Sequence, residues 1–216
     1  MDEIIIMKIV KYSLGQLQAN CYFLIEGQEC LVIDPGDEAN FILEELQRQK
    51  LHLIGVMATH GHFDHIGAVG EIQLSFNVPL HIFIEDQFLV DRLNETAKYF
   101  LGFNPHFIKP KIVNYLNKKK LTINNYQLSI IHSSGHTPGS CCFYIKEENA
   151  VFTGDTLFKD GIGRYDFSYS NKKDLKQSLE QIFKLPEETT VYSGHGEETN
   201  LHEEKNTALH YINIMK

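Results

Sequence analysis

The sequence lacks any apolar run as long as the ~18 residues that a membrane-spanning helix requires, so we expect no membrane partner. It also lacks a basic excess, because 20 Lys and Arg residues stand against 28 Asp and Glu, for a formal net charge of -8. Nucleic acid attracts positively charged surfaces, so this balance argues against a nucleic-acid partner. No linker rich in proline or glycine interrupts the 216 residues, and we expect a single domain over residues 1–216.

Cysteine is scarce as well. Cys21, Cys30, Cys141 and Cys142 form no CxxC pair, and two adjacent cysteines on a strand point to opposite faces. Free buried thiols in a reducing compartment fit this pattern. The first residues are acidic, Lys8 interrupts their apolar run, and no small-residue cleavage site follows. We therefore expect no targeting signal and a cytoplasmic location.

The predicted elements begin with strands and continue with strands that alternate with helices, and this order occurs roughly twice. Alternating or continuous apolar runs predict strands at residues 4–12, 21–26, 30–34, 53–60, 78–84, 126–133, 140–146, 150–155 and 189–194. Apolar residues at helical spacing predict helices at 37–50, 65–76, 172–185 and from 201 onward, with a helix-rich segment at 85–117. This order predicts an α/β protein in which two sheets pack face to face with helices outside.

Side chains that bind metals are concentrated in the segment THGHFDH, residues 59–65. His60, His62, Asp64 and His65 follow directly after the apolar run LIGVMA, which is a predicted buried strand. A loop that follows a rigid strand can aim several side chains at one point. Imidazole and carboxylate groups bind divalent metal ions. We interpret this segment as part of a metal site rather than as a histidine-rich surface loop.

Three other positions repeat this design, in which a glycine-flanked ligand follows an apolar strand. They are His136 in SSGHTPGS, Asp155 in FTGDTL and His195 in VYSGHGEET. An isolated histidine is usually a surface or hydrogen-bonded residue, so each is weak evidence alone. Together the four segments supply five histidines and two aspartates, enough for two ions bridged by one carboxylate. Nitrogen and oxygen ligands without thiolate suit zinc, iron or manganese, in a catalytic site with positions left for water.

Five short motifs resemble the metallo-β-lactamase fold superfamily and occur in the order found there. They are IDPG (residues 33–36), THGHFDH (59–65), GHTPGS (135–140), GDTLF (154–158) and SGHG (193–196). The resemblance covers nearly the whole chain and implies a four-layer αββα sandwich of two mixed β-sheets with helices outside. The pairing of GDTLFKDGIGRYDF with SGHGEET is most similar to the glyoxalase II-like (hydroxyacylglutathione hydrolase-like) hydrolases, in their short form.

The resemblance also implies a role for each candidate ligand. The first metal ion would be bound by His60, His62 and His136, the second by Asp64, His65 and His195, and Asp155 would bridge them. Two divalent ions per chain are implied, with zinc favoured over iron or manganese. Asp34 would orient the ligand loop, although an aspartate before Pro-Gly also forms turns for purely local reasons.

Hydrolysis is the chemistry that such a site would perform. Two ions that share an oxygen ligand lower the pKa of a bridging water, so hydroxide exists at neutral pH and attacks a carbonyl. A thiolate with an ordinary pKa near ~8.5 leaves without a dedicated acid, so a thioester suits the site better than an amide. Asp64 has a possible second role in orienting the hydroxide. We expect a small-molecule thioester as the substrate.

Arg164 and Tyr165 follow soon after Asp155 and are candidate substrate-binding residues. In relatives that use glutathione, a basic residue at this place binds a substrate carboxylate. Those relatives have a tyrosine two places after the basic residue, whereas this chain has Asp166. Both a substrate-binding Arg164 and an internal salt bridge between Arg164 and Asp166 remain open.

Two other functions compete with thioester hydrolysis. A persulfide dioxygenase of the same superfamily resembles the chain in its HxHxDH and GxGRxDF segments and binds one iron through the equivalents of His60, His136 and Asp155. Its last motif is of the GHDY type, whereas this chain has GHGEET. The other alternative is a metal-binding interaction protein without turnover, which the complete ligand set disfavours. The sequence leaves the oligomeric state open.

Overall fold

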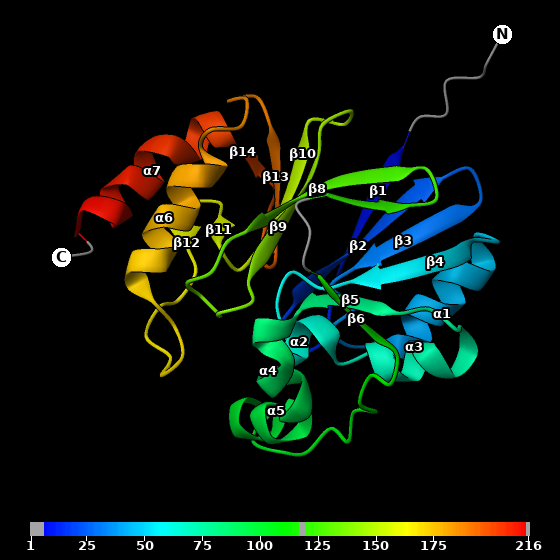
Figure 1. Ribbon diagram of the computed structural model, residues 1–216. Helices are drawn as coiled ribbons and strands as arrows, with labels where there is room; N and C mark the ends of the chain where they lie inside the picture. The colour runs from blue at the N-terminus through cyan, green and yellow to red at the C-terminus, as the bar shows by residue number, and fades with distance from the viewer. Residues whose placement is uncertain (1–6, 117–119, 215–216) are drawn as a thin grey trace, which may run out of the picture. The chain divides into compact units, whose positions relative to one another are not determined.

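The computed structural model describes residues 7–116 and 120–214, and Figure 1 traces their strands and helices. The chain divides into two compact units. The first comprises residues 7–58, 62–81 and 88–114, and the second comprises 59–61, 82–87 and the described residues from 115 onward. The boundary passes through THGHFDH, because Gly61 belongs to the second unit and His62 to the first. The single domain over residues 1–216 stays a prediction.

Six strands form the first mixed sheet, in the order β1-β2-β3-β4-β5-β6. They are β1 (Lys8–Leu14), β2 (Ala19–Glu26), β3 (Glu29–Ile33), β4 (His52–Met57), β5 (Leu80–Phe83) and β6 (Val113–Leu116). β1, β2 and β3 are antiparallel neighbours, whereas β4 is parallel to β3 and to β5. Ile33 pairs with Met57 where β3 and β4 end, so Asp34 and Ala58 continue from the same edge of this sheet.

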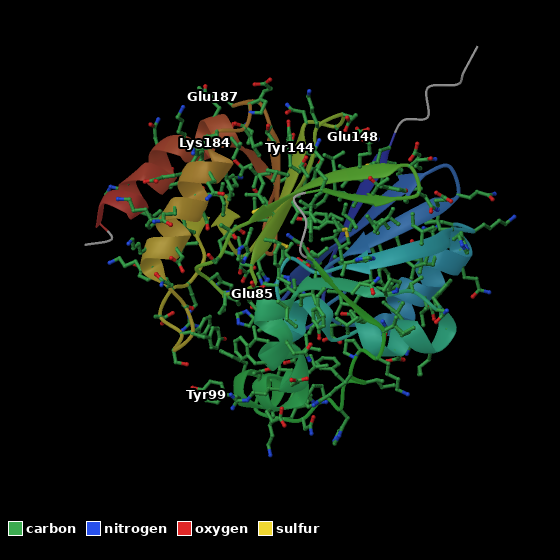
Figure 2. All side chains as sticks on the ribbon, viewed as in Figure 1. Glu85, Tyr99, Tyr144, Glu148, Lys184 and Glu187 are labelled. Carbon is green, nitrogen blue, oxygen red and sulfur yellow. The ribbon has the colours of Figure 1, made fainter. Side chains whose placement is uncertain are left out.

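Helices follow these strands in the order that the sequence predicts, with two differences. They are α1 (Ala39–Arg48), α2 (Phe63–Ile66), α3 (Val69–Ser75), the 3-10 turn η1 (Ile84–Asp86), α4 (Gln87–Asp91) and α5 (Leu93–Leu101). The single helix predicted at 65–76 is interrupted, because the Ala68 N–H donates to the Pro35 carbonyl. The helix-rich segment predicted at 85–117 is wrong at its end, where β6 forms. Tyr99 projects outward from α5 and is 82% exposed, whereas Phe100 stacks on Phe63 (Figure 2).

The second mixed sheet has the order β14-β13-β10-β9-β8-β7. Its strands are β7 (Lys120–Ile123), β8 (Tyr126–His132), β9 (Cys141–Ile145), β10 (Ala150–Gly154), β13 (Thr190–Ser193) and β14 (Thr199–Asn200), and β11 (Leu157–Phe158) pairs separately with β12 (Gly161–Ile162). β9 and β10 are buried along their whole lengths, which explains their continuous apolar runs. The parallel pairing of Gly154 with Ser193 makes the segments after β10 and β13 leave the same edge of the sheet.

Two helices complete the second unit, α6 (Lys172–Ile182) and α7 (Leu201–Ile214). The Asn171 side chain accepts hydrogen bonds from the N–H groups of Lys173 and Asp174, and this cap determines where α6 begins. Leu175 and Leu179 of α6 are fully buried in a cluster with residues of β9, β10 and β13. The packing of α6 against the strands thus supports the rigid strand ends that carry candidate ligands.

Within the described residues, the structure contains no helix that is both long and apolar enough to cross a membrane.

Candidate metal centre

Four of the seven predicted ligands lie in the second unit, and Asp155 is in the middle of them. Asp155 Oδ2 lies 3.5 Å from His136 Nε2, and Asp155 Oδ1 lies 3.7 Å from His195 Nε2. A ligand nitrogen of His60 lies within 4.8 Å of a ring nitrogen of His136 and within 4.8 Å of a carboxylate oxygen of Asp155. A single carboxylate therefore directs its two oxygens at two different histidines, which is the geometry that a bridging ligand requires.

Strand ends and tight loops of the second unit place these four side chains. Asp155 follows β10 and His195 follows β13, while His136 lies in the loop between β8 and β9. Gly154 has φ +50°, and a Cβ at this position would lie 2.2 Å from Thr59 Oγ1. Only glycine fits there without strain. Gly154 thus lets the strand that carries Asp155 approach the segment that carries His60.

Hydrogen bonds to the second ring nitrogen hold the histidines of this unit in place. His136 Nδ1 donates to the Arg164 carbonyl oxygen at 2.9 Å, which leaves Nε2 facing Asp155. Thr59 Oγ1 lies 3.1 Å from His60 Nδ1. Such partners fix the tautomer and the ring orientation of histidines that bind metals. Both rings thereby have their Nδ1 atom held by a protein oxygen.

The first unit carries the other three predicted ligands on and beside α2. His62 precedes α2 in an extended conformation, and Asp64 and His65 are in the helix. His65 Nε2 lies 3.9 Å from Asp64 Oδ2, and His65 Nδ1 is hydrogen-bonded to Asp34 Oδ2 at 2.9 Å. The side chains of Asp34 and His65 are 1% and 0% exposed. Asp34 follows β3 with φ +53° and holds the His65 ring through this hydrogen bond, while its predicted role in orienting the ligand loop stays a prediction.

The donor atoms of the seven predicted ligands fit a divalent metal ion. All are imidazole nitrogens or carboxylate oxygens, the set that zinc, iron and manganese accept. The four cysteines are buried and form no disulfide, as the sequence predicts. Burial raises the pKa of the Cys142 thiol to about 12, so this side chain stays protonated at neutral pH and is a poor metal ligand.

The two candidate substrate-binding residues lie on an exposed segment of the second unit. Arg164 donates two hydrogen bonds to Asp166, Nε to Oδ1 and Nη2 to Oδ2, both at 2.9 Å. The hydrogen bond from Arg164 lowers the pKa of Asp166. Arg164 also lies over the Phe167 ring, 4.4 Å from its centroid, and Tyr165 is 38% exposed. The internal salt bridge that the sequence left open is therefore formed, and substrate binding by Arg164 and Tyr165 stays a prediction.

Sequence reasoning missed Asp86, which lies at the end of η1 and is completely buried. Its carboxylate accepts hydrogen bonds from Gly61, Thr137 and Gly139, each at 2.7 Å. Gly61 lies beside His60, and Thr137 lies beside His136. The only signal in the sequence is a pair of acidic residues, Glu85 and Asp86, after the strand at 78–84, and this signal has no distinctive spacing.

Comparison with known proteins assigns the family. The model of the metallo-β-lactamase superfamily matches residues 14–195. "Probable metallo-hydrolase YqgX" of Bacillus subtilis is 35% identical over 199 residues, which cover 90% of this chain and 93% of that protein. "Hydroxyacylglutathione hydrolase GloC" of Haemophilus influenzae is 32% identical over 202 residues, covering 92% of this chain and 95% of that protein. The chain belongs to the metallo-β-lactamase superfamily.

Solved structures confirm the fold. The crystal structure of the BLEG-1 B3 metallo-β-lactamase has a TM-score of 0.86 at 33% identity and covers 92% of this chain and 97% of its own. The crystal structure of TTHA1623 in a di-iron-bound form has a TM-score of 0.84 at 34% identity. The match covers 92% of this chain and 98% of the TTHA1623 chain. The predicted metallo-β-lactamase fold, with mixed sheets and helices, is confirmed. This fold implies divalent metal binding, and its members include metallo-hydrolases.

Proposed function

We propose that the protein is a hydrolase that binds two divalent metal ions and cleaves a small-molecule thioester. The observation that carries the proposal is Asp155, whose two oxygens face His136 and His195. A carboxylate between two imidazoles can contact two cations at once and offset part of their mutual repulsion. This geometry favours a two-metal site over a site with one ion.

The ligands of both ions are the seven residues of the superfamily motifs. His60, His62 and His136 would hold the first ion, Asp64, His65 and His195 would hold the second, and Asp155 would be shared between them. The Arg164 carbonyl oxygen holds the His136 ring through Nδ1. The Asp34 carboxylate holds the His65 ring through Nδ1 as well, so in both rings Nε2 would be the metal ligand.

The ions would lower the pKa of a shared water, so that hydroxide is available at neutral pH. Asp64 would accept a hydrogen bond from the hydroxide and orient it toward the carbonyl carbon of the substrate. Phe167 packs edge to face on His136, with 5.6 Å between the centroids, and provides an apolar wall next to the ligands. An apolar wall suits the acyl group of a thioester, and the thiolate product needs no acid to leave.

Similarity to GloC supports a thioester, since that relative is named as a hydroxyacylglutathione hydrolase. β-Lactam hydrolysis is a second candidate, because the chain is 33% identical to the BLEG-1 metallo-β-lactamase and 32% identical to GloC. For the metal, we propose zinc, with iron as its competitor because TTHA1623 was crystallised with two irons. The donor atoms accept either metal.

Elemental analysis of the purified protein, combined with a substrate panel, tests these proposals. The panel contains a hydroxyacyl thioester of glutathione, the same acyl group on a smaller thiol, a β-lactam and glutathione persulfide. We expect two ions per chain and turnover of thioesters. A protein that holds one iron and consumes oxygen with the persulfide would instead be a dioxygenase. Two ions with turnover of the β-lactam alone would reject the thioester.

A further inference from the structure

Asp86 is a buried carboxylate outside the ligand set, and it joins three chain segments of the second unit. Oδ2 accepts hydrogen bonds from the Gly61 N–H and the Thr137 hydroxyl, and Oδ1 accepts one from the Gly139 N–H. All three distances are 2.7 Å, which is short for bonds from backbone N–H groups and typical of a charged acceptor. The neighbouring side chain of Glu85, in contrast, is exposed (Figure 2).

Two of the three donors to Asp86 belong to residues that directly follow candidate ligands. The Gly61 N–H is part of the peptide group that joins His60 to Gly61, so this bond fixes the backbone immediately after His60. Thr137 directly follows His136, and its donor is the side-chain hydroxyl. The rings of His60 and His136 lie 5.0 Å apart at 82°. One carboxylate therefore constrains the backbones of two ligands that are 76 positions apart in the sequence.

Glycine at position 139 makes this close approach possible. A Cβ at this position would lie 2.6 Å from Asp86 Cγ and 2.7 Å from Asp86 Oδ1, a separation that real atoms do not adopt. Thr137 is also bonded to Ser140, with 2.8 Å between the hydroxyl oxygens, so the whole turn closes on Asp86. The loop around His136 is thus shaped to receive this carboxylate.

Stability alone is a poor account of Asp86. Burial raises the pKa of its carboxyl, because removal from water disfavours the charge, and the three hydrogen bonds only oppose this effect. A buried charged group therefore adds little to folding and is better explained by the geometry that it imposes. Here that geometry is the separation of two metal ligands.

We propose that Asp86 is a positioning residue that sets the separation of His60 and His136 and thereby determines the affinity for the first metal ion. The proposal rests on the two-metal site described under Proposed function. Residues behind metal ligands typically change metal affinity by about 10- to 100-fold when they are replaced. Asp86 acts on two ligands through their backbones, so its effect should lie in that range.

Asp86→Asn tests the proposal with almost no change in volume. An amide has a single acceptor oxygen, so its NH2 group must face either the Gly139 N–H or the donors from Gly61 and Thr137. We expect the affinity for the first zinc ion, measured by competition with a chromogenic chelator, to fall about 10- to 100-fold. Thr137→Val removes one of the three bonds and should cause a smaller fall. If the Asp86→Asn variant does not fold, Thr137→Val serves as the test in its place.

Glu204→Gln is the matched control. Glu204 is also a buried carboxylate of the second unit, and it accepts bonds from the Asp160 N–H at 2.9 Å and the Thr199 hydroxyl at 2.8 Å. Neither donor adjoins a candidate ligand. The control should unfold at a lower temperature than the parent, yet bind zinc with the parent's affinity when measured well below that temperature.

The outcomes separate this proposal from the one on which it rests. Parent protein with two zinc ions and an Asp86→Asn variant with a selectively weakened ion would support the positioning role. Equal zinc affinities in the parent, Asp86→Asn and Thr137→Val would overturn it while leaving the two-metal hydrolase intact. An equal loss in Glu204→Gln would also overturn it, because general destabilisation would then explain the effect. A parent that binds no zinc would overturn both proposals.

Discussion

Replacement of Asp34 is a direct test of how the chain prepares the second metal site. Its carboxylate is bonded to His65 Nδ1 at 2.9 Å, and both side chains are buried. Asp34 has φ +53°, so alanine would add backbone strain to the loss of the carboxylate. Asp34→Gly avoids this strain, because glycine adopts positive φ readily. Asp34→Asn is the companion variant, since its amide oxygen can still accept the bond without the charge.

The expected magnitude follows from the character of this bond. A hydrogen bond to a charged group contributes about 1.5–3 kcal/mol, and burial of both partners removes the usual compensation by water. Loss of the bond leaves the His65 ring free to rotate or to change tautomer. Affinity for the second ion should therefore fall about 10- to 150-fold in Asp34→Gly, at about 1.4 kcal/mol for each factor of ten. The fall in Asp34→Asn should be smaller, because the amide keeps the orientation of the ring.

Chelator competition at neutral pH, performed on protein that circular dichroism shows to be folded, measures this affinity. Occupancy of the first ion serves as the internal control, because the hydrogen bond of Asp34 is made to His65, a proposed ligand of the second ion. An Asp34→Gly variant that holds both ions as tightly as the parent would refute the reasoning. The carboxylate would then serve the turn alone, as an aspartate before Pro-Gly often does.

Three further predictions concern other residues. Asp155→Asn retains one acceptor oxygen and loses the negative charge. Turnover should fall ~100-fold or more, and elemental analysis should show fewer than two ions per chain. Turnover and metal content equal to those of the parent would exclude a bridging role. Asp166→Asn breaks a solvent-exposed ion pair, and such pairs contribute little to stability, so thermal unfolding should barely change. If Arg164 binds substrate, KM for a thioester with a carboxylate should decrease, and an unchanged KM would argue against that role. Burial lowers the pKa of His81, so the folded state favours the neutral ring and stability should fall as pH drops below about 6.5. His81→Gln should reduce this loss of stability. The measurement is the free energy of unfolding in urea at about pH 7 and 5, and an equal decrease in the variant and the parent would contradict the prediction.

The order of elements and the motif positions were predictable because both depend on local patterns. Buried strands such as β9 and β10 read as continuous apolar runs, and α6 has apolar residues at helical spacing after Asn171. Glycine-flanked ligands at strand ends also stand out against these runs. The ligand roles themselves stay predictions, since the spacing of ligands in a chain does not determine which atoms face a metal.

Contacts between distant segments were not predictable from the sequence. Asp86 bonds to Gly61 and Thr137 across 25 and 51 positions, and no local pattern marks such partners. The strands β11, β12 and β14 escaped detection because they have two residues each, too few for periodicity to appear. The four-residue strands β6 and β7 were missed as well. Arg164 and Asp166 show the opposite case, because two residues so close in the chain were an obvious candidate for a salt bridge.

The discontinuity of the second unit has a consequence for how the protein is made. Residues 59–61 and 82–87 leave the ribosome well before the strands from 120 onward that they join. Contacts of such long sequence separation form slowly, because the intervening chain must first lose conformational freedom. Asp86 stays without its Thr137 and Gly139 donors until residue 139 has been synthesised. The candidate metal centre is therefore a late product of folding, and a cell must protect the nascent chain until it is complete.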